Sequence, residues 1–518
     1  MTRNRAQCAP EKWAHCLFFN TIRAAGWARL QVDPILSHWL GFVVLLIIVA
    51  GYYLFLLSNG TLQLFAPEML DRAFDNMLVH LLHGEFTVDR DAIGFEAFTR
   101  DGKAYTYFGI FPAVLRLFAI PFTDIAQAEL ARLSCLTAVV IFVALQLRML
   151  LIIHHSLPTV SRRPEFLAVM VVATVLSGPQ LYILGSASIY HEPILWSAAM
   201  AASFNLVIVR TTFGAKNLRG RDLVLLAALA GLAINTRASI GVALYLGTIL
   251  LVACTLWRRC APDRGAQQFS VKASCLSSTI LPPIAILGLA AALVGVVNFE
   301  RWGNAFTFAD FHYYDMIVNA NRNLVEVIRK YGEFDLGRVW IGALYYATGI
   351  PYLLKAMPPF AEFLRARIVS LEPPPITPVL TNPLTIILAA IGLYGVWWKP
   401  EFSTRYVAIL RLALLGHAGA VILVLAFIFF TLRYRLDFTP FMTLAAFVGY
   451  GSASIAVAET CEFWRKRIRI ATIGLCFLGV LSSHYVLLIH KVYSFAVPMD
   501  VRISLFPFAP FHYTTLNR

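Results

Sequence analysis

Charged residues are scarce in this sequence. Asp, Glu, Lys and Arg together supply 14% of the 518 residues, whereas hydrophobic residues supply 59%. An average soluble domain carries roughly 25% charged residues, and a chain with so little charge would aggregate in water. The composition therefore excludes a soluble protein and predicts a polytopic membrane protein.

A separate basic domain is also missing. The net charge of +14 would by itself be compatible with nucleic-acid binding. The Lys and Arg residues, however, lie in short clusters between hydrophobic runs, as the positive-inside rule places them in membrane proteins. We therefore expect membrane lipids, and no nucleic acid, among the partners.

Soluble domains, repeats and exterior cysteines are absent as well. All eight cysteines fall in predicted spans or cytoplasmic segments, so we expect neither an exterior disulfide framework nor a cysteine-based metal site. Residues 1–37 are basic and lack a small-residue cleavage site, which predicts a cytoplasmic N-terminal segment rather than a cleavable signal peptide.

What the chain has in abundance is hydrophobic runs of about 17–25 residues, the length that crosses a bilayer core of about 30 Å. These runs predict an all-α polytopic membrane protein with about eleven transmembrane helices. The predicted spans are 38–58, 128–153, 165–185, 189–210, 222–238, 240–257, 277–298, 384–398, 406–430, 437–458 and 470–490.

The distribution of basic residues predicts the orientation of these spans. With a cytoplasmic N-terminus, every second loop is basic, as the positive-inside rule requires. The opposite, exterior side then holds two long loops, 59–127 and 299–383, and the C-terminal tail. We divide the chain into the N-terminal segment 1–37, a transmembrane domain 38–460, and residues 461–518 with the last span and the exterior tail. A plasma or inner membrane is the expected location.

The first exterior loop is acidic in an otherwise basic protein. Pro67 to His83 has an apolar stripe at helical spacing and predicts an amphipathic helix at the membrane surface. Asp71 and Asp75 lie four residues apart on its polar side, where we expect them to face a cavity or water. A solvated polar face without function is the alternative interpretation.

Further along this loop, Asp101-Gly102 predicts a tight turn between two strand-like or irregular pieces. The segment from Ile110 to Leu117 follows and predicts a second interfacial helix, which Pro121 ends.

Several motifs, in this order, resemble those of the GT-C glycosyltransferases, and most closely the bacterial members that use polyprenyl-phosphate sugars. The likeness covers about residues 38–460. It rests on the two surface helices of the first loop and on five segments: Tyr107 to Pro112, Ala131-Arg132, Tyr190-His191-Glu192, Asn298 to Phe306, and Arg433 to Pro440.

The resemblance implies transfer of a sugar from a polyprenyl phosphate to a hydroxyl of a lipid, glycan or protein at the exterior face. The attacking hydroxyl loses a proton, for which a carboxylate is a suitable general base. By resemblance Asp75 occupies the position of the catalytic acid, and Asp71 is the second candidate. Many GT-C enzymes have two adjacent acids here, whereas this chain has Asp75-Asn76.

The leaving phosphate calls for cations, and arginine suits it because a guanidinium pairs two phosphate oxygens at once. Each candidate also has a structural interpretation. Arg237 could snorkel to the interface, Arg116 could face lipid headgroups, and Arg435 or Asp437 could form a structural ion pair. The candidate phosphate or substrate ligands are Arg237, Arg433, Arg435, Arg116 and Tyr434.

Two further groups complete the expected site. His312 and Tyr313, in the second long loop, are candidate contacts to the sugar or the acceptor. His191 and Glu192, together with Asp75, are candidate ligands of a divalent metal such as Mg²⁺ or Mn²⁺, and a buried structural pair is the alternative for them.

Other functions remain open at this stage. A transporter or flippase of lipid-linked glycans would show sequence repeats and mid-span charges, neither of which is seen. A glycan polymerase or ligase differs from GT-C enzymes only in the first-loop pattern. The chain could also be a non-catalytic GT-C-like protein, and the absence of a second acid next to Asp75 would then reflect lost activity.

Overall fold

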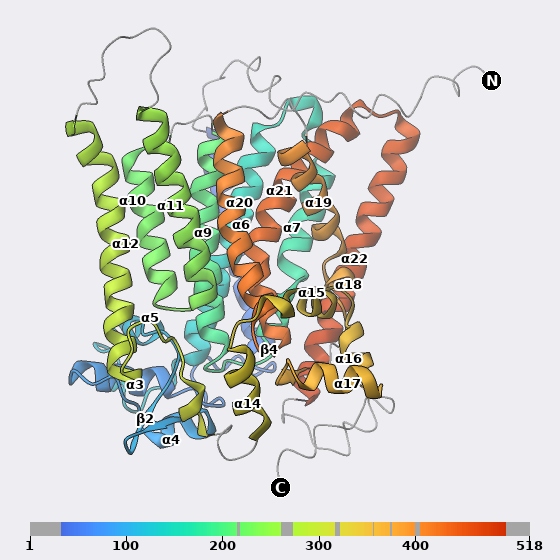
Figure 1. Ribbon diagram of the computed structural model, residues 1–518. Coiled ribbons are helices and arrows are strands. Elements are labelled where there is room, and N and C mark those ends of the chain that lie inside the picture. Colours follow the sequence, from blue (N-terminus) through green and yellow to red (C-terminus); the bar gives the residue numbers. More distant parts are fainter. Residues whose placement is uncertain are drawn as a thin grey trace, which may run out of the picture.

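The protein is a bundle of long helices with short helices and short strands at one end (Figure 1). The computed structural model describes residues 33–214, 218–260, 273–315, 322–355, 357–372, 376–398 and 405–493. Residues 1–32 of the predicted cytoplasmic segment and the predicted exterior tail from residue 494 lie outside these residues. The long helices are α2 (Asp33–Leu57), α6 (Ala131–Ser156), α7 (Pro164–Leu176), α9 (His191–Phe213), α10 (Gly220–Ile234), α11 (Ala238–Cys260), α12 (Ala273–Trp302), α19 (Pro383–Trp398), α20 (Arg405–Ala426), α21 (Arg435–Glu459) and α22 (Glu462–Tyr493).

The shorter elements connect these helices. They are α3 (Ala73–Leu82), α4 (Arg90–Ile93), α5 (Phe111–Leu115), α8 (Pro179–Ile183), α14 (Arg322–Tyr331), α15 (Val339–Thr348), α16 (Ile350–Leu354), α17 (Pro358–Arg365), α18 (Pro378–Thr381), several single 3₁₀ turns, and the strands β1 (Phe98–Arg100), β2 (Lys103–Tyr105), β3 (Ser370–Leu371) and β4 (Phe429–Phe430).

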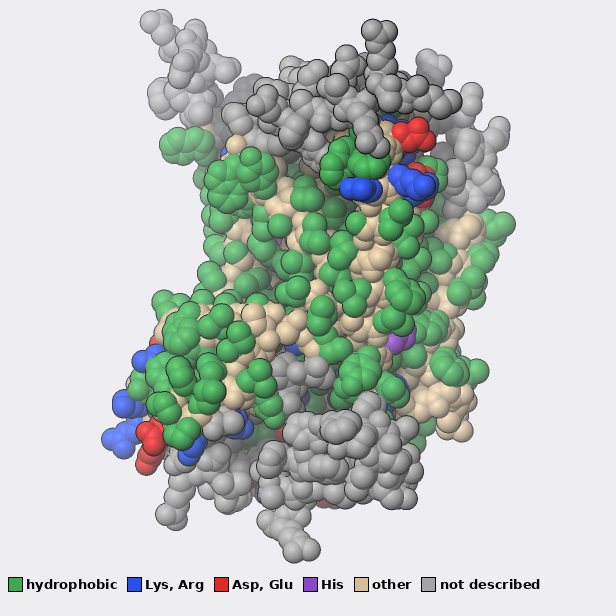
Figure 2. Space-filling view, turned by 90° about the vertical axis from the view of Figure 1, so that its right-hand side faces the viewer, with side chains coloured by type: hydrophobic (Ala, Val, Ile, Leu, Met, Phe, Trp, Pro, Cys, Tyr) green, Lys and Arg blue, Asp and Glu red, His purple; other side chains and the backbone are tan. Residues whose placement is uncertain are grey.

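The chain is an all-α, multi-pass membrane protein. Within the described residues, nine helical segments are long and apolar enough to cross a membrane. The surface agrees, because a hydrophobic belt covers the middle of the molecule while Lys, Arg, Asp and Glu gather toward its two ends (Figure 2).

A helix is found at each of the eleven predicted spans. Three of these helices are short. α7 has 13 residues, but it continues through α8 as one apolar segment of 20 residues. α10 and α19 have only 15 and 16 residues. Both are too short for a full crossing of about 20 residues, so the count of eleven stays a prediction.

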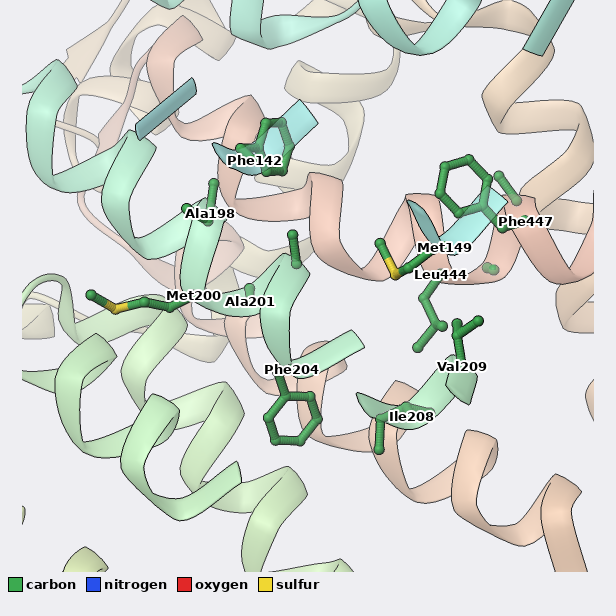
Figure 3. Packing of buried hydrophobic residues seen from close by; sticks show 14 of the residues in the cluster. Phe142, Met149, Ala198, Met200, Ala201, Phe204, Ile208, Val209, Leu444 and Phe447 are labelled. Atoms are coloured by element: carbon green, nitrogen blue, oxygen red, sulfur yellow. The ribbon is translucent and has the colours of Figure 1, made fainter. Parts of the chain in front are cut away.

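The core of the bundle forms where α6, α9 and α21 meet (Figure 3). α9 lies at the centre of this core. In its most apolar stretch of 18 residues 78% of the helix is buried, compared with 17% in the peripheral α2. Phe142, Phe204 and Phe447 are almost completely buried there. Small residues bring other helices close together, as is usual in membranes. A Cβ at Gly449 of α21 would lie 1.8 Å from the Leu388 carbonyl oxygen of α19.

The two long loops lie at the same end of the bundle (Figure 1), as the predicted topology requires. They also contact each other. Asp315 of the second loop accepts hydrogen bonds from Arg90 at 2.5 Å and from Thr99 at 3.0 Å, both in the first loop. The two loops therefore form one structure over the ends of the helices.

The predicted Asp-Gly turn is present. β1 and β2 pair antiparallel with Arg100 opposite Lys103. Asp101 and Gly102 between them have φ angles of +53° and +75°, the positive values that both central residues of a type I′ turn adopt.

The predicted helix from Pro67 to His83 was too long, and its acidic face was assigned wrongly. α3 begins only at Ala73, because Leu70 has a φ of +58° and the Asp71 carboxylate accepts from the Glu68 amide at 2.6 Å, which closes a turn. Asp75 is only 1% exposed and faces protein instead of water. The second predicted helix is α5, followed by the single turn Arg116–Phe118.

Candidate active site at the loop end of the bundle

The centre of the site is a buried cluster of two carboxylates and one guanidinium. Arg116 Nε donates to Asp75 Oδ1 at 2.6 Å, and both terminal nitrogens of Arg116 donate to Glu192. The Ser134 hydroxyl also donates to Glu192, at 2.5 Å. Arg116 is 3% exposed, which excludes the predicted alternative that it faces lipid headgroups.

Asp75 keeps one oxygen free of protein partners. Its Oδ2 is buried and makes no hydrogen bond to any residue that the structure describes. Burial raises the pKa of Asp75 to about 6, although the neighbouring Arg116 guanidinium opposes this shift. A carboxyl group with such a pKa and an available lone pair is suited to accept a proton near neutral pH.

An open groove of about 820 Å³ lies beside this cluster. We call it the α6 groove; its walls include Arg116, Phe118, Phe122, Ser134 and Trp196. Phe118 and Phe122 are 78% and 87% exposed, so the groove has a strongly apolar rim. Asp75 does not line it directly and reaches it through Arg116.

A second cavity, of about 160 Å³, lies between the first loop, the corner of α10 and α11, and the ends of α12 and α20. We call it the α12 cavity; its lining includes Tyr107, Arg237, Arg301, Glu333 and Tyr434. Most of its remaining wall is apolar. The cavity is linked to α3 because Met77 Sδ lies 3.8 Å from Arg301 Nη2.

Gly109 of the Tyr-Phe-Gly motif makes this arrangement possible. A Cβ there would lie 2.1 Å from the Asn235 carbonyl oxygen, and Phe111 donates its amide to the same oxygen at 3.0 Å. The first loop is thereby bound to the corner between α10 and α11, which carries Arg237. Only glycine allows two backbones to approach so closely.

Arg237 is paired within the protein. Its guanidinium donates to both carboxylate oxygens of Asp437, at distances of 2.6 to 3.0 Å, and its Cζ lies 4.9 Å from the centre of the Tyr434 ring. The predicted structural ion pair of Asp437 thus exists, but its partner is Arg237 and not Arg435.

Arg433 lies in an aromatic and acidic environment. Its Cζ is 4.3 Å from the centre of the Tyr190 ring and 5.6 Å from that of Tyr434. Tyr190 donates its hydroxyl to the buried Glu96, and Tyr314 of the second loop donates to the same oxygen at 2.8 Å. Glu96 therefore joins both long loops to the start of α9.

Arg435 points into a different cavity, of about 350 Å³, between α7, α15, α19 and α21. We call this the α19 cavity. One terminal nitrogen of Arg435 donates to the Ile376 carbonyl at 2.8 Å, while Nε and Nη2 are buried without a partner among the described residues. The structure thus separates Arg435 from Arg433 and Arg237.

The remaining predicted residues lie at the edges of the site. Asp71 is buried and holds the turn before α3. The His312 side chain is 60% exposed and pairs with Asp310 at 2.8 Å. The Tyr313 ring centre lies 6.0 Å from Arg100 Cζ. All three are close in sequence to residues that form the site, but none lines the three cavities.

The predicted metal ligands do not assemble into a metal site. His191 Nδ1 contacts the Ser186 carbonyl at 2.7 Å, and the Glu192 oxygens are occupied by Arg116 and Ser134. No group of three or more His, Cys, Asp or Glu in the described part of the chain is arranged to hold a metal ion. A guanidinium between the carboxylates does not fit a divalent cation, because two cations would then share one small site.

Two residues of the α12 cavity, Arg301 and Glu333, are not among the predicted site residues. Arg301 is 2% exposed although it is charged. Burial raises the pKa of Glu333 to about 7, and Asp310 adds to this effect. Arg301 stands in a motif quoted for the family resemblance, but Glu333 has no local signal, because only the packing of the second loop brings it to the cavity.

The geometry therefore defines a class: a multi-pass membrane protein with buried acid–base and arginine groups at one end of its bundle. No protein-family model and no curated protein matches the chain. Among solved structures, it is similar to the apo oligosaccharyltransferase of Archaeoglobus fulgidus (15% identity, 87% of this chain and 55% of that chain, TM-score 0.43).

It is also similar to the oligosaccharyltransferase AglB of that organism in complex with an inhibitory peptide and a dolichol-phosphate (13% identity, 88% and 56% of the two chains, TM-score 0.45). The chain spans little more than half the length of these proteins.

Proposed function

We propose that the protein is a glycosyltransferase that moves one sugar from a polyprenyl phosphate to a hydroxyl at the exterior face of the plasma membrane. The acceptor is a lipid, a glycan or a protein. The observation that carries this proposal is the buried Asp75, whose Oδ2 is free while Arg116 holds Oδ1. A passive membrane anchor has no use for such a carboxylate, because burying it is unfavourable.

In the proposed reaction Asp75 Oδ2 accepts the proton of the attacking hydroxyl. The hydroxyl oxygen bonds to the anomeric carbon of the sugar, and the bond from that carbon to the phosphate oxygen breaks. The phosphate leaves on its lipid with the bonding electrons. Arg116 fixes the orientation of Asp75 and, by its charge, favours the ionised form that acts as a base.

The α6 groove and the α12 cavity suit two substrates, because each has a lining residue in contact with α3: Arg116 with Asp75 and Arg301 with Met77. We assign the acceptor to the α6 groove, whose mostly apolar lining also includes Arg116 and Ser134 and suits an amphiphilic molecule. In this assignment the acceptor hydroxyl approaches Asp75 past Arg116, which lines the groove and binds that carboxylate. Arg433 beside Tyr190 is our candidate for a further contact to the substrate. Arg237, already neutralised by Asp437, is assigned a positioning role for Tyr434.

The proposal is tested with purified protein in nanodiscs, radiolabelled polyprenyl-phosphate sugars, and a cell-envelope extract as acceptor. Wild type is compared with Asp75→Asn and with Asp91→Asn, an exposed acid of the same loop. We expect transfer by wild type and Asp91→Asn and none by Asp75→Asn, provided that all three remain folded.

Two other outcomes contradict parts of the proposal. Transfer that persists in Asp75→Asn assigns the base to Asp71, Glu192 or Glu333. If the protein binds the donor but consumes none under any condition, a flippase or a non-catalytic protein is the better description.

A further inference from the structure

Arg301 is a buried cation whose hydrogen-bonding capacity is largely unused. A guanidinium has five N–H donors. Nη1 donates to the Phe108 carbonyl at 2.7 Å, the contact of Nη2 is to the weakly accepting sulfur of Met77, and Nε is buried without a partner. No residue in the described part of the chain forms an ion pair with it.

Arg338 shows what a purely structural buried arginine looks like in the same protein. It is 0% exposed, and its guanidinium donates to the carbonyl groups of Arg367, Glu333, Ala426 and Gly332 at 2.7 to 3.3 Å. These bonds use all three guanidinium nitrogens and pin the second loop. Arg301 has one such bond, so a comparable structural role does not explain its burial.

Burying an unpaired charge is unfavourable unless a partner arrives. Arg301 lines the α12 cavity, whose other charged lining groups are Arg237, already paired with Asp437, and Glu333. The hydroxyl-bearing side chains of Tyr107, Thr236 and Tyr434 share the lining. The cavity thus offers one uncompensated cation with several hydrogen-bond donors, a combination that suits a compact oxyanion.

The walls indicate what the anion is attached to. Val294, Val297, Leu423, Val424 and Phe427, at the ends of α12 and α20, form an apolar side of the cavity. On α12 the neighbouring Val296 and Phe299 are more than half exposed, in the hydrophobic surface of the bundle. An anion carried on an apolar chain fits such walls, whereas a sugar alone does not.

We propose that the α12 cavity binds a phosphate monoester and that Arg301 is its principal ligand. Under the function proposed above, on which this assignment rests for its meaning, the ester is the polyprenyl phosphate released when the sugar is transferred; in the donor the same phosphate is a diester. The position agrees with that function, because Met77 and Asp75 lie on the same short helix, α3. Arg301 would then contact the phosphate while Asp75 contacts the acceptor.

The test measures thermal unfolding of the full-length protein in nanodiscs during titration with three probes: inorganic phosphate, geranyl phosphate and geraniol. A ligand that binds the folded state raises the melting temperature. We expect geranyl phosphate to stabilise wild type and uncharged geraniol not to do so. If inorganic phosphate also stabilises the protein, the site binds phosphate in general. If it does not, the site is specific for lipid phosphates. Both results support a phosphate-binding site.

The variants are Arg301→Met, Arg301→Lys and the matched control Arg338→Met. Loss of a charge-assisted contact predicts about tenfold to hundredfold weaker binding of geranyl phosphate by Arg301→Met, with partial rescue by Arg301→Lys. Without ligand, Arg301→Met should melt no lower than wild type, since it removes an uncompensated charge. Arg338→Met should melt at a lower temperature than wild type but bind geranyl phosphate with wild-type affinity. If Arg338→Met does not fold, Arg338→Lys replaces it as the control, with the same expectation.

Equal affinity of wild type and Arg301→Met for geranyl phosphate overturns the assignment, as does the absence of any response of wild type to either phosphate. The measurement does not depend on sugar transfer. Binding that requires Arg301 in a protein without transferase activity would therefore contradict the proposed function and leave this site intact.

Discussion

At the scale of single residues, the protein stabilises unfavourable charges by pairing them. Asp75 and Glu192 share Arg116, and Asp437 holds Arg237. The side chains of the first cluster are at most 3% exposed. Removing one partner of such a buried group leaves the remaining charge without compensation. This lowers the stability of the fold more than replacing the whole pair by apolar residues would.

We therefore predict that Arg116→Met lowers the free energy of unfolding by about 3–5 kcal/mol. Fluorescence-detected thermal melts of the detergent-solubilised protein would measure the loss. Arg90→Met is the control. Its guanidinium also pairs with a carboxylate, that of Asp315, but is 64% exposed, so we expect less than about 1 kcal/mol. Equal losses in the two variants would contradict the special position of Arg116.

A second residue-scale prediction concerns pH. Burial raises the pKa of Asp75 from 3.8 to about 6. Between these two pH values the carboxyl group is protonated in the folded state and ionised in the unfolded state. Stability should therefore fall as the pH rises from about 4 through about 6. Activity should rise over the upper part of the same range, because the base must be ionised.

Parallel measurements of melting temperature and transfer rate between pH 4 and 8 would check both trends. In Asp75→Asn, which cannot titrate, this contribution to the stability slope should vanish. A wild-type slope that survives unchanged in the variant would assign the effect to another group, such as Glu333.

At the scale of elements, glycines decide which helices touch. Gly392 of α19 faces Gly449 of α21, and a Cβ at Gly392 would lie 2.0 Å from the Ala445 carbonyl oxygen. Such contacts are with backbone atoms, which cannot move aside without shifting the helix. The short α19 is thereby held against α21 and closes one side of the α19 cavity.

We predict that Gly449→Ala separates α19 from α21 and lowers the melting temperature. Gly474→Ala in α22 is the matched control, because a Cβ there meets nothing within 4 Å and alanine favours a helix by about 1 kcal/mol over glycine. Side-by-side melts should show a clear loss for the first and no loss for the second. No difference between them would mean that α19 does not pack as described.

At the scale of the whole molecule, the chemistry is concentrated at one end. The two long loops lie at the end of the bundle that carries α3, α5 and α14 (Figure 1). Asp75 belongs to α3, and residues of the first loop line both the α6 groove and the α12 cavity. The positive-inside rule assigns this end to the exterior. The orientation stays a prediction until it is measured.

Labelling of single cysteines in a cysteine-free background would measure it. We expect a membrane-impermeant maleimide to label Asp91→Cys, in the first loop, in cells with a permeabilised outer envelope. Val160→Cys, 68% exposed in the loop between α6 and α7, should react only after the inner membrane is opened. The opposite result would invert the topology and place the proposed site in the cytoplasm.

The sequence by itself determined the class of the protein and the approximate place of its helices. Long apolar runs have to be buried or to face lipid, and a helix is the simplest structure that satisfies their backbone groups in a membrane. Local signals also sufficed for the Asp101-Gly102 turn and for placing Asp75 on a helix, because a positive φ or a helical stripe is encoded by neighbouring residues.

Only the tertiary structure decided which charges meet. Arg116 and Glu192 are 76 residues apart, and Arg237 and Asp437 are 200 apart, so no local pattern distinguishes a paired arginine from an available one. The helix boundary at Ala73, the burial of Asp75 and the uncompensated Arg301 likewise depend on contacts between distant segments. Charge pairing and desolvation are properties of the packed bundle, and the candidate site is made of them.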